Sequence, residues 1–213
     1  MSSSELESDA RRTDSIAFTE VPIAEHLEAI RPHHRFKGVA RCGKAWDLSH
    51  LEPFAFRVDP GLGFEVTVVV LFSCHCFTRS LARDGRSRRE IPAGELFNDG
   101  REVRVLCDLR YELSRRHLPV LMRELRRRTI QFARDNPQNF VTMQPITGVS
   151  ETIHQYVVFF DIARDPKRKG RLLLQVQSAY AVEATFREHF RLRRRITLVN
   201  LLKATTLRRK VTG

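Results

Sequence analysis

The sequence has few cysteines and no long apolar segment. Its 213 residues include four cysteines, Cys42, Cys74, Cys76 and Cys107, and a single tryptophan. Secreted disulfide frameworks are denser and occur in shorter chains, so we expect reduced thiols and a cytoplasmic protein. No run approaches the roughly 18 apolar residues that a membrane-spanning helix requires. The 10 glycines and 9 prolines are too few for a collagen-like or low-complexity chain.

Several catalytic motifs are also absent. The sequence has no GxxxxGK[ST] phosphate loop, no GxGxxG, no HExxH and no GxSxG. Its aspartates are scattered rather than bunched as a two-metal nuclease would need. The Cys74-His75-Cys76 tripeptide suggests a metal site, but in a regular strand His75 points away from both thiols. We therefore predict no cofactor and no metal, with buried inert thiols favoured over a structural zinc.

Positive charge is abundant and concentrated at the C-terminal end. The chain has 37 Lys and Arg against 25 Asp and Glu, a formal net charge of +12. Residues 164–213 hold fourteen basic and three acidic side chains, so they account for +11 of it. A nearly neutral body with a cationic end favours a polyanionic partner, because each phosphate contact releases counterions. Nucleic acid is the first candidate, and a solvated helix face is the alternative.

The chain divides into three parts. Residues 1–14 are polar and acidic, without the basic and apolar segments of a secretory signal, and are predicted to be a disordered lead. Residues 15–182 are predicted to form a single α+β domain. Residues 183–213 are predicted to be a basic helical tail that packs on the domain or extends from it, with Ile196, Val199 and Leu202 on one face.

Alternating apolar residues predict the strands of this domain. The clearest strand covers residues 64–77, and residues 102–109 form another. Residues 155–163 and 171–182 flank the turn sequence RDPKRKG and predict an antiparallel hairpin. Residues 21–30 predict a short helix, whereas residues 78–101 are polar and predict a loop. The expected fold is α+β, with an antiparallel sheet of about four to five strands, a central helix and a basic helical C-terminal segment.

The central helix follows residue 109. Leu118, Leu121, Leu125 and Phe132 supply its buried stripe. Arginines lie between them and cannot all share that stripe, so most of them are expected to face water. These arginines are Arg123, Arg126, Arg127 and Arg128.

Three basic clusters are the candidate nucleic-acid contacts. Arginine dominates them, and its guanidinium suits bidentate phosphate contacts and stacking on bases. No RNP-like strand, KH loop or C2H2 spacing accompanies them, so the sequence names no nucleotide target. The candidate binding residues are Lys167, Arg168, Lys169, Arg191, Arg193, Arg194, Arg195, Arg208 and Arg209.

Two histidines suggest a reaction as well as binding. A pair of imidazoles, each titrating near pH 6.5, can serve as base and acid in metal-independent RNA cleavage by the 2′-hydroxyl. His50 and His75 are the candidates, with Arg110 and Tyr111 assisting by stabilising charge. For each histidine, the alternative is a surface or hydrogen-bonded core residue. The expected arrangement resembles that of compact bacterial ribonuclease toxins, which is an analogy of architecture only.

The sequence therefore predicts a basic protein directed at nucleic acid, RNA more than DNA, and a metal-independent ribonuclease in its catalytic form. Two alternatives stay open. One is a non-catalytic nucleic-acid-binding or regulatory module, and the other is a protein that docks an acidic protein partner or forms a homo-oligomer. No membrane partner is expected.

Overall fold

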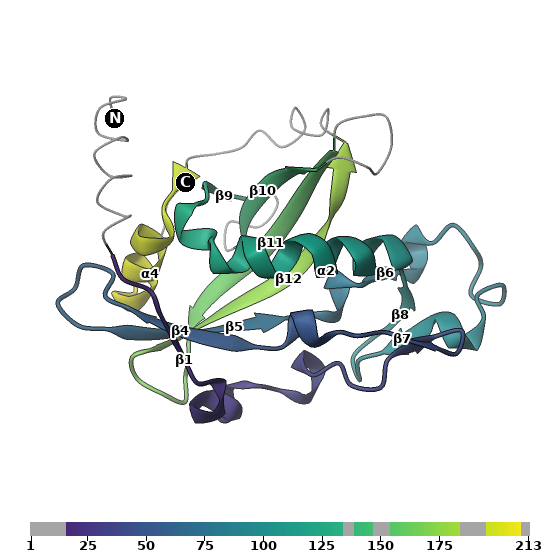
Figure 1. Cartoon of the computed structure of the whole chain (residues 1–213), viewed down its shortest axis with the longest axis horizontal. Helices are drawn as coiled ribbons and strands as arrows, with labels where there is room; N and C mark the ends of the chain where they lie inside the picture. Colours follow the sequence, from purple (N-terminus) through teal and green to yellow (C-terminus); the bar gives the residue numbers. More distant parts are fainter. Residues whose placement is uncertain (1–15, 134–138, 147–153, 184–194, 210–213) are drawn as a thin grey trace.

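A large mixed sheet forms the centre of the structure, which is a computed structural model that describes residues 16–133, 139–146, 154–183 and 195–209 (Figure 1). Its eight strands pair with antiparallel neighbours, except that β5 and β12 run parallel. In spatial order they are β1 (Thr19–Val21), β4 (Phe54–Val58), β5 (Val66–Phe72), β12 (Arg171–Glu183), β11 (His154–Arg164), β10 (Phe140–Ile146), β9 (Ile130–Phe132) and β13 (Arg195–Ile196).

The predicted antiparallel sheet of four to five strands with a central helix is therefore wrong. The sheet is larger because β1, β9 and β13 each add only two or three residues, too few to show a period. It is mixed because β5 pairs in parallel with β12, a strand about one hundred residues later. The helix is not central either, since it lies across one face of the sheet (Figure 1).

The two faces of the sheet are covered by different elements. Strand alternation turns Val68 and Val70 toward the main core, which holds Leu118 from helix α2 (Asp108–Arg123) and Leu201 from helix α4 (Leu198–Thr206). The neighbouring Val69 faces a smaller cluster with the 3-10 helix η1 (Ile23–Ala29). Alpha-helices thus cover one face and the N-terminal segment covers part of the other.

Short 3-10 turns connect these elements. Some of them carry polar residues discussed below, among them His50 in η3, His75 in η4 and Arg126 in η7. They are η2 (Pro32–His34), η3 (Ser49–Leu51), η4 (Cys74–Cys76), η5 (Leu81–Arg83), η6 (Ala93–Glu95) and η7 (Leu125–Arg127).

A smaller sheet lies beside the N-terminal end of α2. Its strands, in spatial order, are β6 (Thr78–Ser80), β8 (Val103–Leu106) and β7 (Leu96–Asn98). Residues 78–101 are therefore not the simple loop that their polarity predicts, because two short strands pair with β8. A two-residue hairpin, β2 (Ala40–Arg41) with β3 (Lys44–Ala45), packs against η6.

Three predicted boundaries change and one hairpin is confirmed. The strand predicted over 64–77 ends at Phe72, because the Ser73 hydroxyl accepts from the amide of His75 and starts η4. The helix predicted over 21–30 is the 3-10 helix η1, with non-helical backbone angles at His26. The apolar helix face predicted to extend to Phe132 is shorter, because α2 ends at Arg123 and Phe132 lies in β9. The β11–β12 hairpin forms as predicted.

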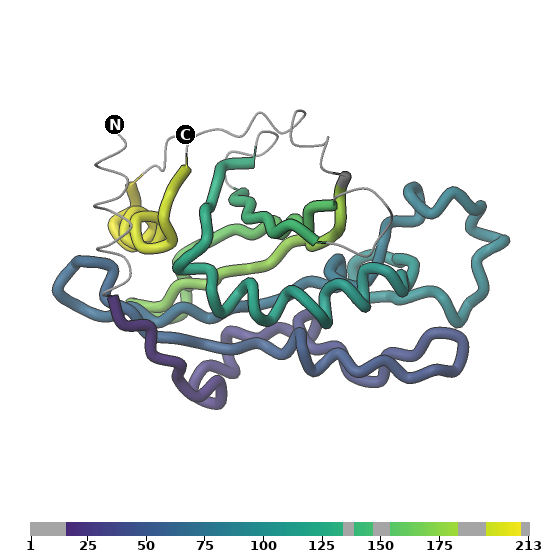
Figure 2. The backbone as a smooth tube through the Cα atoms, turned by 45° about the horizontal axis from the view of Figure 1, so that its top comes forward, coloured from purple at the N-terminus to yellow at the C-terminus, as the bar shows by residue number. Residues whose placement is uncertain are grey.

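Helix α4 packs into the main core rather than standing free. Leu198, Leu201 and Leu202 are buried, and the Thr197 hydroxyl accepts from the Asn200 amide at the helix start. Figure 2 shows α4 beside the segment that leads from α2 through η7 to β9. None of the helices in the described part of the chain is long and apolar enough to cross a membrane.

Candidate functional site

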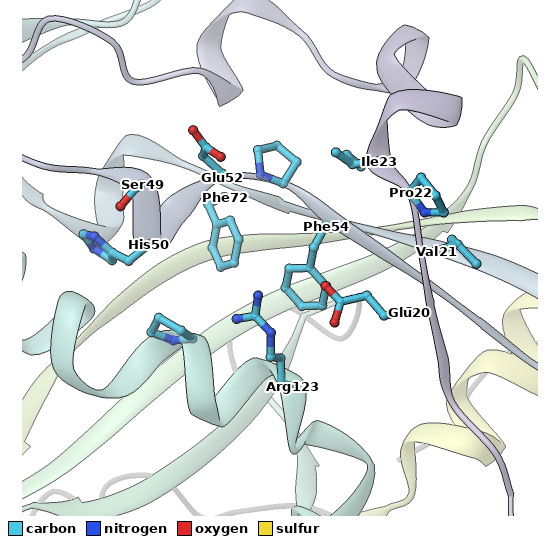
Figure 3. A pocket seen from close by; sticks show the side chains of 12 residues that line it. Glu20, Val21, Pro22, Ile23, Ser49, His50, Glu52, Phe54, Phe72 and Arg123 are labelled. Atoms are coloured by element: carbon cyan, nitrogen blue, oxygen red, sulfur yellow. The ribbon is translucent and has the colours of Figure 1, made fainter.

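A cleft opens between β1, η3, β4 and the C-terminal half of α2 (Figure 3). Its volume is about 500 Å³, which lies within the range of small-molecule sites. The chain reaches it from four separate segments, so only the folded protein assembles it. Its lining residues are Glu20, Val21, Pro22, Ile23, Ser49, His50, Glu52, Pro53, Phe54, Phe72, Pro119 and Arg123.

The apolar part of the cleft is aromatic. The rings of Phe54 and Phe72 lie with their centroids 6.4 Å apart, and Phe72 is buried while Phe54 is partly exposed. Register explains their meeting: Phe54 pairs with Val70 across β4 and β5, so the side chains of Phe54 and Phe72 emerge on the same face. Only the partly exposed Phe54 ring offers apolar surface to a ligand, and the buried Phe72 ring packs against it.

Arg123 brings a positive charge over this surface. Its guanidinium carbon lies 4.9 Å from the centroid of the Phe54 ring, a cation–π geometry that holds the side chain across the cleft (Figure 3). No carboxylate among the described residues lies within ion-pair distance of it. Its N–H groups are therefore available to an anionic ligand.

Two carboxylates complete the polar lining. Glu52 and Glu20 are both exposed and reach the cleft from different sides, Glu52 from the turn before β4 and Glu20 from β1 (Figure 3). Ionised carboxylates accept hydrogen bonds and donate none. The cleft thus combines two acceptor groups, one donor group of positive charge and an aromatic wall.

His50 lines the cleft, but its ring nitrogens point elsewhere. The Ser114 hydroxyl donates to the Tyr111 carbonyl at 2.9 Å, so it accepts from Nε2–H of His50, 2.8 Å away. Nδ1 of His50 is also buried. Burial lowers the pKa of His50, against the raising effect of Asp47, so its ring is neutral near pH 7. This geometry orients the imidazole toward α2.

Tyr111 lies in the same cluster. Its ring stacks on Trp46, with centroids 4.3 Å apart and planes 9° apart, and meets the His50 ring edge-on at 6.0 Å. It is buried in the main core. The structure therefore brings Tyr111 to His50, as part of a packed aromatic group.

His75 lies at a different place, in η4. Its Nε2 is 2.7 Å from a carboxylate oxygen of Glu102. Burial lowers the pKa of His75, and the charge of Arg104 acts in the same direction, while Glu102 opposes both. No hydrogen bond or ring contact joins His75 to His50 within the described ranges.

Arg110 holds the turn that carries His75. Its Nη1 donates to the carbonyl oxygens of His75 at 2.9 Å and of Thr78 at 2.8 Å, and its guanidinium carbon lies 4.7 Å from the Tyr180 ring centroid. Burial lowers the pKa of Arg110. The four predicted catalytic residues thus form two pairs, His50 with Tyr111 and His75 with Arg110.

The cysteines near His75 are buried thiols. Burial raises the pKa of Cys74 and of Cys76 to about 12, and the Cys74 thiol donates to Asp99 at 3.4 Å. The sequence argument assumed that residues 74–76 lie in a regular strand, but they form the 3-10 turn η4. Across the described ranges, no group of three or more His, Cys, Asp or Glu side chains is arranged to hold a metal ion.

The basic hairpin tip is anchored to the N-terminal segment. Arg168 donates to the Glu25 carbonyl at 3.0 Å and lies 3.5 Å from the Glu28 carboxylate. Lys167 and Lys169 beside it are exposed. The tip is therefore held against η1.

The C-terminal candidates are only partly described. Arg195 in β13 is exposed beside Gln131 of β9, and Arg208 and Arg209 are exposed after α4. The remaining candidates, Arg191, Arg193 and Arg194, lie outside the described residues.

Sequence reasoning missed the cleft and its arginine. The sequence predicts only that most arginines at the end of the helix face water. Arg123 is exposed, whereas Arg126 is half-buried, with its guanidinium carbon 5.5 Å from the Phe18 ring centroid. The visible signal was the run of arginines at the end of the helix. Its aromatic partners come from β4 and from the segment before β1, which no local pattern links to a helix.

The comparisons with known proteins give one match. A family model described as the YjaZ family matches residues 37–206, which is well over half of the chain. This chain belongs to the YjaZ family. No curated protein and no solved structure matches it. The part of this YjaZ-family protein that the model matches includes His50, Glu52, Phe54, Phe72 and Arg123, whereas the β1 side of the cleft precedes it.

Proposed function

We propose that this YjaZ-family protein binds nucleic acid, with single-stranded RNA favoured over DNA. The observation that carries the proposal is the pair Arg123 and Arg126, each held over an aromatic ring and neither paired with a described carboxylate. A guanidinium stacked on a ring keeps its N–H edge free for phosphate oxygens and loses less entropy on binding.

These two arginines belong to a larger basic surface, which we call the arginine surface. The 3-10 turn η7, which carries Arg126, packs against α4. Strand β9 follows η7 in the chain and pairs with β13. Figures 1 and 2 both place α4 at the end of the molecule where α2 leads into β9. The arginine surface consists of Arg123, Arg126, Arg195, Arg208 and Arg209.

Single strands fit this surface better than a duplex groove. Bases of unpaired RNA stack on aromatic side chains and on guanidinium planes, and phosphates follow the basic residues between them. The sequence has no C2H2 spacing, the motif that would place a zinc-finger helix in a duplex groove. Binding of this type depends on charge and stacking and is strongly weakened by salt.

The test is a salt titration. Fluorescence anisotropy of a labelled single-stranded RNA is measured from 50 to 200 mM salt with the full chain, the Arg123→Ala/Arg126→Ala variant and Arg116→Ala. Arg116 is an exposed arginine of α2 that does not line the cleft, so it is the matched control. We expect the log–log salt slope to fall in magnitude by about 1.4 in the double variant, roughly 0.7 per phosphate contact for a single strand. A negligible and salt-independent response of the full chain would refute the proposal.

Cleavage by His50 and His75 stays a prediction, and we propose binding without it because the His50 ring faces Ser114. Incubating the same RNA with wild type, His50→Ala and His75→Ala decides the matter. Turnover by wild type that both variants lose would overturn the non-catalytic proposal. A homo-oligomer predicts a light-scattering mass above that of one chain in the absence of RNA. Docking of an acidic protein predicts a higher mass only when that partner is added.

A further inference from the structure

We propose that the cleft binds a single unpaired guanine, with its phosphate on Arg123. This inference rests on the proposed function, because it names the nucleotide that the bound strand would insert. It concerns the cavity of about 500 Å³ between β1, η3, β4 and α2, which shares only Arg123 with the arginine surface.

The cavity has the size and wall for a base. A volume of about 500 Å³ lies within the roughly 300–1,000 Å³ of small-molecule sites. The partly exposed Phe54 ring packs on the buried Phe72 with centroids 6.4 Å apart, and Pro22, Pro53 and Pro119 add apolar surface. Flat unsaturated rings are the ligands that such a wall stabilises.

The carboxylates select for a base that donates. Glu52 and Glu20 both line the cavity, and an ionised carboxylate offers two acceptor oxygens. Guanine presents two adjacent N–H donors on its Watson–Crick edge, at N1 and N2, which match the two oxygens of one carboxylate. Adenine and cytosine place an acceptor nitrogen beside their amino group, and uracil places its single N–H between two carbonyl acceptors. Guanine is therefore the base that a carboxylate binds best.

Figure 3 favours Glu52 over Glu20 as that carboxylate. Glu52 and Arg123 enter the view from opposite sides of the Phe72 ring, from the turn before β4 and from α2. A base in the cavity beside Phe54 can then present its donor edge to Glu52 and its phosphate to Arg123. An acceptor carboxylate and a separate guanidinium together suit a ligand that carries both N–H donors and an anion.

The experiment measures nucleotide binding by isothermal titration calorimetry with the full chain. The probes are guanosine, inosine, adenosine and cytidine 5′-monophosphates, and guanosine without phosphate. Inosine lacks only the 2-amino group, so it isolates one of the two donor bonds. We expect the guanine nucleotide to bind about tenfold more tightly than the inosine nucleotide and more tightly still than the other two.

Variants then assign the two contacts. Glu52→Gln is expected to remove the preference for guanine while leaving adenosine monophosphate binding unchanged. Arg123→Ala is expected to weaken all four nucleotides about tenfold and to leave guanosine without phosphate unaffected. Glu112→Gln and Arg116→Ala are the controls, because both side chains are exposed on α2 and neither lines the cleft.

Each contrary outcome is distinct. Equal affinity for the four nucleotides, or no nucleotide binding while RNA still binds in a salt-dependent way, overturns the guanine site and leaves the proposed function standing. Loss of RNA binding by the full chain overturns the proposed function itself. A lysine-rich peptide that binds in place of nucleotides, with Glu52→Gln abolishing it, overturns the guanine assignment in favour of a cationic ligand.

Discussion

Replacing Arg171 tests how the N-terminal segment is held to the sheet. Arg171 begins β12 and is 1% exposed as a side chain. Its Nε donates to Asp165 at 2.7 Å, and its Nη1 donates to the Glu28 carboxylate of η1. Asp165 is itself buried, at 3% side-chain exposure, so removing the arginine leaves a buried carboxylate with less compensation.

The expected cost of Arg171→Met is large. Two unit charges 2.7 Å apart attract by about 6 kcal/mol at an effective dielectric constant of 20. Desolvation offsets much of that attraction in the intact pair, but breaking a buried pair on one side typically costs about 3–5 kcal/mol. For a chain of this size 1 kcal/mol corresponds to roughly 2–4 °C, so the midpoint should fall by about 6–20 °C.

The assay is thermal unfolding followed by circular dichroism. Arg164→Met is the matched control, because Arg164 is exposed at the end of β11 on the same hairpin. The Arg171→Met/Asp165→Asn double variant should recover part of the loss, since it no longer buries an unpaired charge. A midpoint for Arg171→Met within about 2 °C of wild type would refute the reasoning.

The contact between Arg171 and Glu28 should also make stability depend on pH in the acid range. The hydrogen bond from Arg171 lowers the pKa of Glu28 from 4.5 to about 2. A carboxylate with a depressed folded-state pKa stabilises the fold above its unfolded pKa, and this contribution is lost as pH falls through the folded value. Stability should therefore drop between about pH 4.5 and pH 2 in wild type, and this drop should be smaller in Arg171→Met.

Two further predictions concern His34 and His50. Burial lowers the pKa of His34 to about 4, so the unfolded chain binds a proton there that the folded chain excludes, and stability should fall by up to about 3 kcal/mol as pH drops from 6.5 to 4. Urea unfolding at pH 7.5 and pH 5 measures this, and His34→Asn should flatten it; an equal loss in both proteins would contradict the assignment. Ser114→Ala should cost about 0.5–1.5 kcal/mol, because it removes the acceptor of the half-buried His50 Nε2. An unchanged urea midpoint would show that water or another group replaces the hydroxyl.

Local patterns predicted the parts of the fold whose contacts are local. The β11–β12 hairpin was predictable because two alternating runs flank a turn of RDPKRKG, and the strands pair directly with each other. The apolar face of β5 was predictable for the same reason, up to Phe72. The end of that strand was not, because the Ser73 side chain caps η4 through one hydrogen bond that alternation does not encode.

Tertiary pairings explain what the sequence left out. The parallel pairing of β5 with β12 brings Val68 beside Leu172, and nothing within either strand specifies that neighbour. The two residues at β13 form a strand only because β9 offers an edge. The sequence therefore predicts fewer strands than the sheet contains, because short strands at a sheet edge form through pairing with a neighbour and are too short to show alternating hydrophobicity.

The candidate site shows the same division between composition and contact. A net charge of +12 indicates a polyanion, but it does not say which cations are available to one. Arg171 is used in a buried ion pair, Arg110 holds two backbone carbonyls, and Arg168 binds the η1 backbone. Arg123 has the same side chain and the same charge, yet it lies over a phenylalanine at the mouth of a cavity.

Which arginine serves the fold and which serves a ligand is decided by its partners. An arginine with carboxylate or carbonyl partners has already exchanged its hydration for internal hydrogen bonds, so a phosphate gains little by approaching it. An arginine supported only by an aromatic face keeps its donors hydrated and oriented outward, and a phosphate can replace that water. On this criterion Arg168, which sequence charge placed in the binding set, should contribute less to RNA affinity than Arg123, which it did not.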